Sequence, residues 1–390
     1  MKKIAIVTTT RAEYGLLAPV ARELRKKESG DFRAELIVSG THLSREYGMT
    51  IEEIEASGAR IDHRIVIPVN SETALDISSN QAEALVQFTK LFLSERYHAV
   101  LLLGDRYEML AVAIAAGNTR TPVFHLCGGD TTEGALDEWI RHSITKISYL
   151  HFVTNEESRR RVIQLGEDPA RVFNYGSTSI DNILTMASMP KEEALQSIGL
   201  NDCKYALCTY HPVTMGNGNT EKQIDSFLEA IRQFPDLQFI VTKSNADQGG
   251  ARINELLDLA KGSIRNLHVF ASLGAKRYLS LMRHAEFVLG NSSSGIIETP
   301  AFHIPTVNIG DRQKGRLQSP GIVNCADDTT SIVDAIKKAM GNEQKTLCQS
   351  SVSLYGDGHA AERIATTSYE TVMNGHIDLK KPFYNLEGQR

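Results

Sequence analysis

Carboxylates follow two apolar runs in the first half of the chain, at the points where the runs end. Asp105 follows Ala99–Leu103, Asp130 follows Val123–Leu126, and Asp137 comes seven residues later. Positioned carboxylates can remove or deliver protons as general bases and acids. Each one alone could be a helix N-cap or part of a surface ion pair. Several of them near two run ends favour an acid–base site instead.

A serine-rich segment in the second half is suited to binding a diphosphate. Ser292, Ser293 and Gly295 follow the apolar run Phe287–Leu289 and open a predicted helix. Backbone N–H groups and hydroxyls at such a point bind anions. Glu298, about a turn later, could accept hydrogen bonds from a ribose. The alternative is ordinary serine capping, but the number of small polar residues exceeds what a cap needs.

Further cationic and polar residues lie where they could contact a phosphate. Each comes shortly after an apolar run: Arg11, Arg106, His211, Asn245 and Arg312. Guanidinium groups bind phosphate oxygens with two parallel hydrogen bonds. Any one of these residues could instead be a surface or packing residue. The glycine patterns of a dinucleotide fold and of a P-loop are both missing from the sequence.

Two series of apolar runs, separated by stretches of helical periodicity, must position these side chains. The first series is Lys3–Val7, Glu35–Val38, Ala99–Leu103, Val123–Leu126 and His151–Val153. The second is Tyr205–Tyr210, Gln238–Thr242, Leu267–Phe270, Phe287–Leu289 and Thr306–Ile309. This alternation predicts parallel sheets covered by helices on both faces, and ligands bind beyond the carboxyl ends of such strands. We therefore expect an α/β protein with two doubly wound domains facing across a cleft.

The domain boundaries are predicted from the same pattern. Residues 1–178 form the first domain, which carries the carboxylates, and residues 179–365 form the nucleotide-binding domain. The stretch Arg171–Ala187 is the expected crossing between them, because it combines turn residues with a helical run. The tail, 366–390, can return to the first domain.

The composition of the 390-residue chain excludes several classes of protein. A net charge of −5 gives no basic balance, so neither nucleic acid nor an anionic membrane is expected as a partner. No apolar run approaches the roughly 18 residues of a membrane span. Five widely spaced cysteines without a CxxC pair favour reduced thiols in the cytoplasm. We expect no bound metal and no redox cofactor.

Seven short motifs together resemble the hydrolysing UDP-N-acetylglucosamine 2-epimerases of sialic acid biosynthesis. They are Arg11–Tyr14, Gly104–Arg106, Gly128–Asp130, Ile140–Lys146, His211–Thr214, Gly290–Ser293 and Gly310–Gln313. The resemblance implies a GT-B-like fold of two Rossmann-like domains and a homodimer or homotetramer. It implies conversion of UDP-N-acetylglucosamine and water to N-acetylmannosamine and UDP, by elimination of UDP and hydration of a 2-acetamidoglucal.

The resemblance also implies roles for the candidate residues. The catalytic residues would be Asp105, Asp130, Asp137 and His211. The substrate-binding residues would be Arg11, Arg106, Asn245, Ser292, Ser293, Glu298 and Arg312. Many relatives carry a glutamate directly before the Gly-Gly pair, where this chain has Cys127. Either Asp130 takes over its role, or Cys127 lies outside the chemistry.

Three other functions stay open on the sequence. The same reaction could act on UDP-2,4-diacetamido-2,4,6-trideoxyglucose, for legionaminic acid, because the residues around C4 and C6 of the sugar are not identified. A GT-B glycosyltransferase would bind UDP similarly but would pass the sugar to an acceptor. A nucleotide-sugar sensor would bind without turnover, and would leave the carboxylates unexplained.

Overall fold

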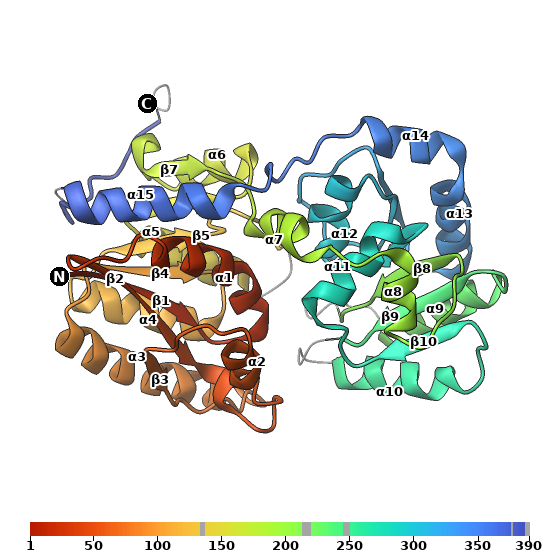
Figure 1. Cartoon of the computed structure of the whole chain (residues 1–390), viewed down its shortest axis with the longest axis horizontal. Coiled ribbons are helices and arrows are strands. Elements are labelled where there is room, and N and C mark those ends of the chain that lie inside the picture. Colours follow the sequence, from red (N-terminus) through yellow and green to blue (C-terminus); the bar gives the residue numbers. More distant parts are fainter. Residues whose placement is uncertain (133–136, 213–219, 245–249, 376, 387–390) are drawn as a thin grey trace. The chain divides into compact units, whose positions relative to one another are not determined.

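The computed structural model describes residues 1–132, 137–212, 220–244, 250–375 and 377–386. They form two units, each built on its own parallel sheet (Figure 1). Unit 1 contains the described residues up to 130, those from 137 to 181 and those from 356 onward. Unit 2 contains residues 131–132 and the described residues from 182 to 355.

Within the described residues, unit 1 has one parallel sheet of seven strands in the order β3-β2-β1-β4-β5-β6-β7. The strands are β1 (Lys2–Thr8), β2 (Phe32–Ser39), β3 (His63–Ile65), β4 (Ala99–Leu103), β5 (Val123–Leu126), β6 (Leu150–Val153) and β7 (Val172–Asn174). The helices are α1 (Arg11–Arg25), α2 (Ile51–Ala56), α3 (Ala74–Glu95), α4 (Tyr107–Asn118), α5 (Asp137–Ile147), α6 (Glu156–Gln164) and α15 (Ala360–Asn374). The strand order reverses between β1 and β4, which is where doubly wound sheets bind ligands.

Two apolar clusters, one on each face of this sheet, form the core of unit 1. Ile4 and Ile6 of β1 pack with α1 and α15, whereas Ala5 and Val7 pack with α3 and α4. Successive side chains of a strand point to opposite faces. Because both faces are covered, the central strands are apolar throughout, which is why their sequences read as continuous apolar runs.

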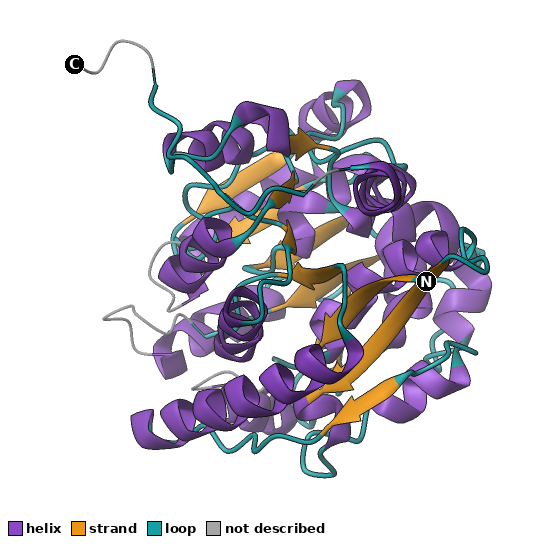
Figure 2. Ribbon diagram, turned by 90° about the vertical axis from the view of Figure 1, so that its left-hand side faces the viewer, coloured by secondary structure: helices purple, strands orange, loops and turns teal. Residues whose placement is uncertain are grey.

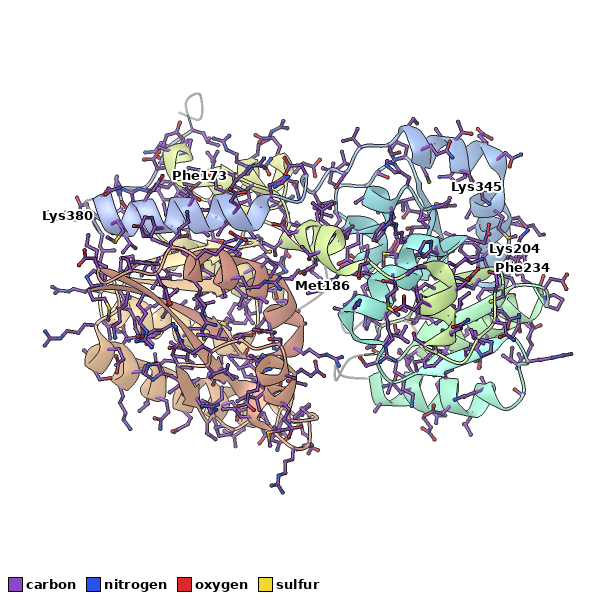
Figure 3. All side chains as sticks on the ribbon, in the orientation of Figure 1. Phe173, Met186, Lys204, Phe234, Lys345 and Lys380 are labelled. Atoms are coloured by element: carbon purple, nitrogen blue, oxygen red, sulfur yellow. The ribbon has the colours of Figure 1, made fainter. Side chains whose placement is uncertain are left out.

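Unit 2 has the same construction, with helices packed on its strands in two apolar clusters. Figure 2 shows this arrangement for unit 1, whose strands lie between helices nearest the viewer. Its described strands pair in the order β10-β9-β8-β11-β12-β13. They are β8 (Tyr205–Thr209), β9 (Gln238–Thr242), β10 (Leu267–Phe270), β11 (Phe287–Gly290), β12 (Thr306–Ile309) and β13 (Ile322–Cys325). The helices are α8 (Lys191–Gln196), α9 (Thr220–Arg232), α10 (Gly250–Lys261), α11 (Gly274–His284), α12 (Ser294–Ile297), α13 (Thr329–Met340) and α14 (Asn342–Ser350). Phe234, labelled in Figure 3, packs against an apolar cluster of this unit.

Each predicted strand is present, and three further strands were not predicted. The missed strands β3, β7 and β13 each lie at the edge of a sheet. An edge strand pairs on one side only and is partly exposed, so it needs no continuous apolar run. β3, for example, is His-Arg-Ile, which carries no strand signal of its own.

The chain passes between the units inside α7 (Thr178–Met186) and returns to unit 1 before α15. The predicted boundary at residue 365 would divide α15, but the structure places the whole helix in unit 1. Its Tyr369 ring meets Phe32 edge-on at 4.8 Å, and Lys2 Nζ donates to the carbonyl of Val372 at 2.6 Å. The apolar face of α15 completes the core of unit 1, so the helix cannot be divided between two units. Among the described helices, none is both long and apolar enough to cross a membrane.

A buried ion cluster fastens the residues after α15 to unit 1. The side chain of Glu167 is 1% exposed and accepts hydrogen bonds from Lys146 at 2.6 Å and Lys381 at 2.8 Å. Nε2 of the buried His151 lies 3.0 Å from the same carboxylate. Phe383 packs on Gly166, where a Cβ would lie 2.3 Å from the ring. Charge pairing and close packing therefore hold this segment against the end of α5.

Glu167 makes the stability of unit 1 sensitive to acid. Burial alone would raise the pKa of this carboxyl, but the hydrogen bonds from His151, Lys146 and Lys381 lower it from 4.5 to about 2. The ionised carboxylate therefore adds stability above about pH 4.5, and this contribution is lost as the pH falls toward 2. We expect Glu167→Gln to be less stable by about 3 kcal/mol at pH 7. Urea unfolding at pH 7 and pH 3 should show the gap between the two proteins shrinking, and a gap independent of pH would contradict this assignment.

Candidate active site

A buried arginine gathers carboxylates at the carboxyl ends of β4 and β5. Arg141 on α5 is 1% exposed. It donates to Oδ2 of Asp105 from Nε at 3.1 Å and also from a terminal nitrogen, and it donates to Glu138 at 2.8 Å. Arg141 also donates a hydrogen bond to the main-chain carbonyl of Asp130 at 2.6 Å. Burial alone would lower the pKa of Arg141, but the ion pairs with the carboxylates raise it above its ordinary value.

The three predicted catalytic aspartates of unit 1 have different surroundings. Asp105 is held through one carboxylate oxygen, Oδ2, and its side chain is 29% exposed. Asp137 begins α5, one turn before Arg141, and is half-buried. Asp130 instead accepts hydrogen bonds on Oδ1 from Thr154 at 2.6 Å and Ser158 at 2.7 Å. The Arg141 cluster thus includes the carboxylate of Asp105 but only the main chain of Asp130.

Cys127, directly before the Gly-Gly pair, has a left-handed backbone with φ of 63°. Its N–H donates to the carbonyl of Phe152 at 2.9 Å, and its side chain packs against an apolar cluster of unit 1. Gly129 is also left-handed, and a Cβ there would lie 2.3 Å from the carbonyl of Ser158. The close approach of α6 to this turn therefore requires a glycine at residue 129.

Glu13, in the first turn of α1, was not among the site residues predicted from the sequence. Glu13 is buried and accepts from the N–H groups of Thr9 at 2.7 Å and Thr10 at 3.1 Å. Burial raises the pKa of Glu13 to about 7, against the lowering influence of Arg106. The Thr-x-x-Glu spacing of a capping box could have identified it. Arg11, the first residue of α1, is exposed.

Arg106 is anchored beside a second buried carboxylate. Its Nε lies 3.3 Å from Glu108, a residue with no exposed surface. Burial would lower the pKa of Arg106, but Glu108 and Glu13 raise it above its ordinary value. The position of this guanidinium is therefore fixed by Glu108 and by the loop after β4.

His211 in unit 2 lies at the end of β8 and is almost fully buried. Its Nδ1 lies 3.2 Å from the hydroxyl of Ser244. Burial and the nearby Arg312 lower the pKa of His211 to about 3, so the imidazole is neutral at pH 7. Because Nδ1 faces Ser244, Nε2 is the ring nitrogen that could contact a ligand.

Ser292 and Ser293, both half-buried, follow β11 at the start of α12. Glu298 ends α12, and burial raises its pKa to about 7 while a hydrogen bond with Ser294 lowers it. The predicted binding residue Asn245 lies outside the described residues. The remaining predicted binding residues of unit 2 follow neighbouring strands of one sheet.

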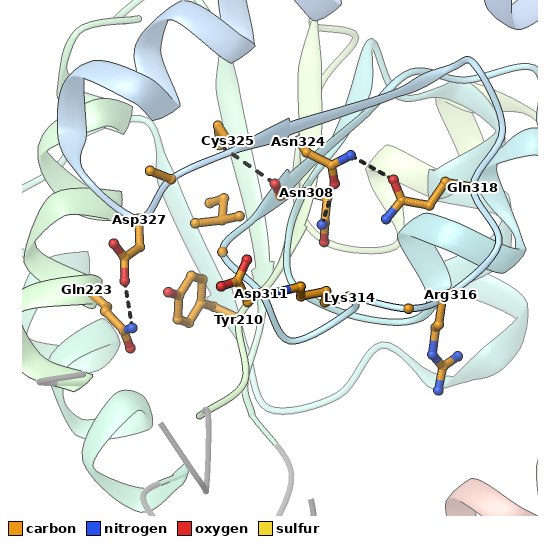
Figure 4. Close-up of a pocket in the computed structure, with 14 residues that line it drawn as sticks. Tyr210, Gln223, Asn308, Asp311, Lys314, Arg316, Gln318, Asn324, Cys325 and Asp327 are labelled. Carbon is orange, nitrogen blue, oxygen red and sulfur yellow. Dashed lines mark hydrogen bonds between the residues drawn. The ribbon is translucent and has the colours of Figure 1, made fainter. Parts of the chain in front are cut away.

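Residues of the loop from 310 to 316 line a pocket of about 820 Å3 (Figure 4). Lys314 and Arg316 line the pocket, whereas Arg312 donates to the carbonyl of Asn291 at 3.1 Å. Figure 4 shows the pocket's amides bonded to one another, with Asn324 joining Asn308 and Gln318. The loop therefore presents its cations in two directions.

A possible metal-ligand group lies in a different part of unit 1. Within the described ranges, Glu35, His63 and Glu95 place one ligand atom each within 4.8 Å of one another. The ammonium of Lys3 lies 2.5 Å from Glu95 and 3.7 Å from Glu35, and Arg33 lies 3.6 Å from Glu35, so two cations pair with the two carboxylates. Lys3 is the second residue of β1, so it lies at the end of the sheet opposite to the carboxylate cluster. This group is therefore an ion-pair network.

Two doubly wound units, one with clustered carboxylates and the other with hydroxyl, imidazole and guanidinium groups, define an α/β protein of the GT-B-like class. Solved structures share this fold. A UDP-GlcNAc 2-epimerase from Neisseria meningitidis, solved with UDP-GlcNAc bound, matches 95% of this chain and all of its own with a TM-score of 0.82 at 19% identity. A putative UDP-N-acetylglucosamine 2-epimerase from Listeria monocytogenes matches 99% of both chains with a TM-score of 0.81 at 18% identity.

Sequence comparison identifies the family. The family model described as UDP-N-acetylglucosamine 2-epimerase matches residues 22–368, and the chain belongs to this family. It is 39% identical to the GDP/UDP-N,N'-diacetylbacillosamine 2-epimerase (hydrolyzing) of Campylobacter jejuni, over 88% of this chain and 89% of that protein. It is 36% identical to the polysialic acid biosynthesis protein P7 of Escherichia coli, over 99% of this chain and 98% of that protein. A Legionella pneumophila UDP-N,N'-diacetylbacillosamine 2-epimerase (hydrolyzing) is 35% identical over 93% of this chain and 94% of its own.

Proposed function

We propose that this protein is a hydrolysing UDP-sugar 2-epimerase that converts UDP-N-acetylglucosamine and water to UDP and N-acetylmannosamine. The observation that carries the proposal is the carboxylate of Asp105, which buried Arg141 holds by one oxygen while the side chain stays partly exposed. A fixed carboxylate with a second oxygen to offer is suited to proton transfer. Hydrolysing relatives at 35–39% identity support the same reaction class.

The proposed reaction has two stages. In the first, a base of unit 1 removes the C2 proton of the sugar while the C1–O bond to UDP breaks, which leaves a 2-acetamidoglucal. In the second, water adds its oxygen to C1 and a proton returns to C2 on the other face. We assign these proton transfers to Asp105 and Asp137, with Asp130 as a supporting residue. The two stages transfer protons, release UDP and add one water without a net oxidation or reduction, so the chemistry needs no redox cofactor.

We assign the nucleotide to residues of unit 2. The hydroxyls of Ser292 and Ser293 would donate to the diphosphate, and Glu298 would accept from the ribose. Arg312 and, from unit 1, Arg11 would stabilise the charge that grows on the departing UDP. Because His211 is neutral, its Nε2–H would act as a hydrogen-bond donor to phosphate.

UDP-N,N'-diacetylbacillosamine is the second candidate substrate. The names of the Campylobacter and Legionella relatives favour it, since both act on this 2,4-diacetamido-6-deoxy sugar by their names. The reaction would be the same, and the two substrates differ only at C4 and C6.

We also propose that the protein is a homodimer or homotetramer in the cytoplasm. Light scattering measures the oligomeric state.

Incubation with each UDP-sugar in deuterated water, followed by proton NMR, tests the function. We expect free UDP and a 2-epimerised sugar carrying deuterium at C2, with the preferred substrate identified by the higher kcat/KM. The solvent label is diagnostic because C2–H cleavage precedes water addition. Release of UDP with hydrogen retained at C2 would indicate simple hydrolysis or transfer and would overturn the proposal. UDP binding without turnover of either sugar would favour a sensor.

A further inference from the structure

Asn291 is the point at which three motif segments of unit 2 meet. Its side chain is buried and forms two hydrogen bonds with the main chain of His211, one to the N–H and one to the carbonyl. Oδ1 accepts from the His211 N–H at 2.7 Å, and Nδ2 donates to the His211 carbonyl at 2.8 Å. One asparagine side chain thus supplies the paired hydrogen bonds that a neighbouring strand would supply beyond the end of β8.

The main-chain carbonyl of Asn291 is held from a different segment. It accepts from Nε2 of Gln313 at 2.8 Å and from the guanidinium of Arg312 at 3.1 Å. Gln313 is itself only 1% exposed, so this amide is not a surface contact. The main-chain carbonyl of Asn291 therefore links the segment that holds His211 to the loop that carries Arg312.

The backbone before Asn291 allows this close packing. Gly290 has a φ of 138°, and a Cβ there would lie 2.0 Å from the carbonyl of Thr209. The Asn291 N–H donates to that same carbonyl at 3.2 Å. Only glycine fits at residue 290, and its absent side chain lets Asn291 reach across to the residue after β8.

We propose that Asn291 and Gln313 are positioning residues that fix His211 and Arg312 relative to Ser292 and Ser293. This inference rests on the proposed function, in which those four residues meet the diphosphate. Neither amide needs to touch the substrate, because each acts through the groups it holds. Hydrogen-bond donors that are already in place around a developing charge do not have to rearrange when the charge appears. No free energy is therefore lost to reorganisation.

Replacing Asn291 by alanine tests the proposal when UDP affinity is measured by calorimetry beside thermal unfolding. Asn266 is a matched control, because it is also buried in unit 2 and its Nδ2 donates to the carbonyls of Phe234 and Leu237, both at 2.8 Å. We expect Asn291→Ala and Asn266→Ala to lower the Tm similarly. Only Asn291→Ala should weaken UDP binding, by 10-fold or more.

Gln313→Met keeps the side-chain length and removes the donor to Asn291. We expect it to weaken UDP binding severalfold with little loss of Tm, and it keeps the proposal testable if Asn291→Ala does not fold. Combining Asn291→Ala with His211→Ala should give a loss smaller than the product of the two single losses, because the Asn291 side chain acts through His211.

Equal UDP affinity in Asn291→Ala and Asn266→Ala would overturn the positioning role, and so would strictly multiplicative losses in the double variant. Neither result depends on turnover. Failure of the proposed function would appear separately, as UDP binding by the unmodified protein without C2 deuteration of either sugar.

Discussion

Replacing Arg141 by methionine is expected to lower the free energy of unfolding by about 3–5 kcal/mol and to abolish turnover. The guanidinium is buried and pairs with Asp105 and Glu138. Methionine fills a similar volume but leaves two carboxylates close together without their shared cation. It also removes the donor to the carbonyl of Asp130. Urea unfolding gives the stability, and the deuterium assay gives the turnover.

Two further variants make the Arg141 result specific. Arg141→Lys should recover only part of the stability, because an ammonium cannot donate in the three directions that the guanidinium covers. Arg64→Met is the matched control, since that side chain is 50% exposed and pairs with an equally exposed Glu55. Its expected cost is below about 1 kcal/mol. An Arg141→Met protein that unfolds at the wild-type urea concentration, or that still turns over, would show that the cluster is not the catalytic scaffold.

Asp105→Asn is expected to reduce kcat by about 10²–10⁴-fold. The amide is close in shape to the carboxylate, but it cannot accept a proton from C2 or return one. UDP affinity should stay near that of the unmodified protein, because the proposed nucleotide residues belong mainly to unit 2. Single-turnover rates in deuterated water, with calorimetry of UDP binding, separate the two effects.

Asp130→Asn is the informative comparison for Asp105→Asn. The amide oxygen of an asparagine at residue 130 can still accept from Thr154 and Ser158, which now donate to Oδ1. We expect turnover to fall by less than about 10-fold, because the hydrogen bonds from Thr154 and Ser158 are kept and preserve the local structure. If Asp130→Asn proves more damaging than Asp105→Asn, the assignment of proton transfer to Asp105 is wrong, and Asp130 is the residue that transfers the proton.

The strands at the centre of both sheets could be predicted from the amino-acid sequence, and so could the strand ends at which the candidate site residues lie. Ala99–Leu103 and Gln238–Thr242 were predicted with the bounds that the structure has. A strand covered on both faces is apolar at most of its positions, and that requirement is visible in a few consecutive residues. The rule that ligands bind beyond the carboxyl ends of such strands then pointed to Asp105 and Ser292 without any tertiary information.

Which of these side chains contact one another could be learned from the tertiary structure alone. Asp105 and Arg141 are 36 residues apart in the sequence. Asn291 forms its hydrogen bonds with His211, which lies 80 residues before it. The carboxylate of Asp130 is engaged by Thr154 and Ser158 from the next strand and helix, although its place in the sequence matched that of Asp105. Periodicity records what each segment buries, because burial is a local requirement. Partnerships between distant side chains leave no local pattern, since they are set by how strands and helices pack side by side.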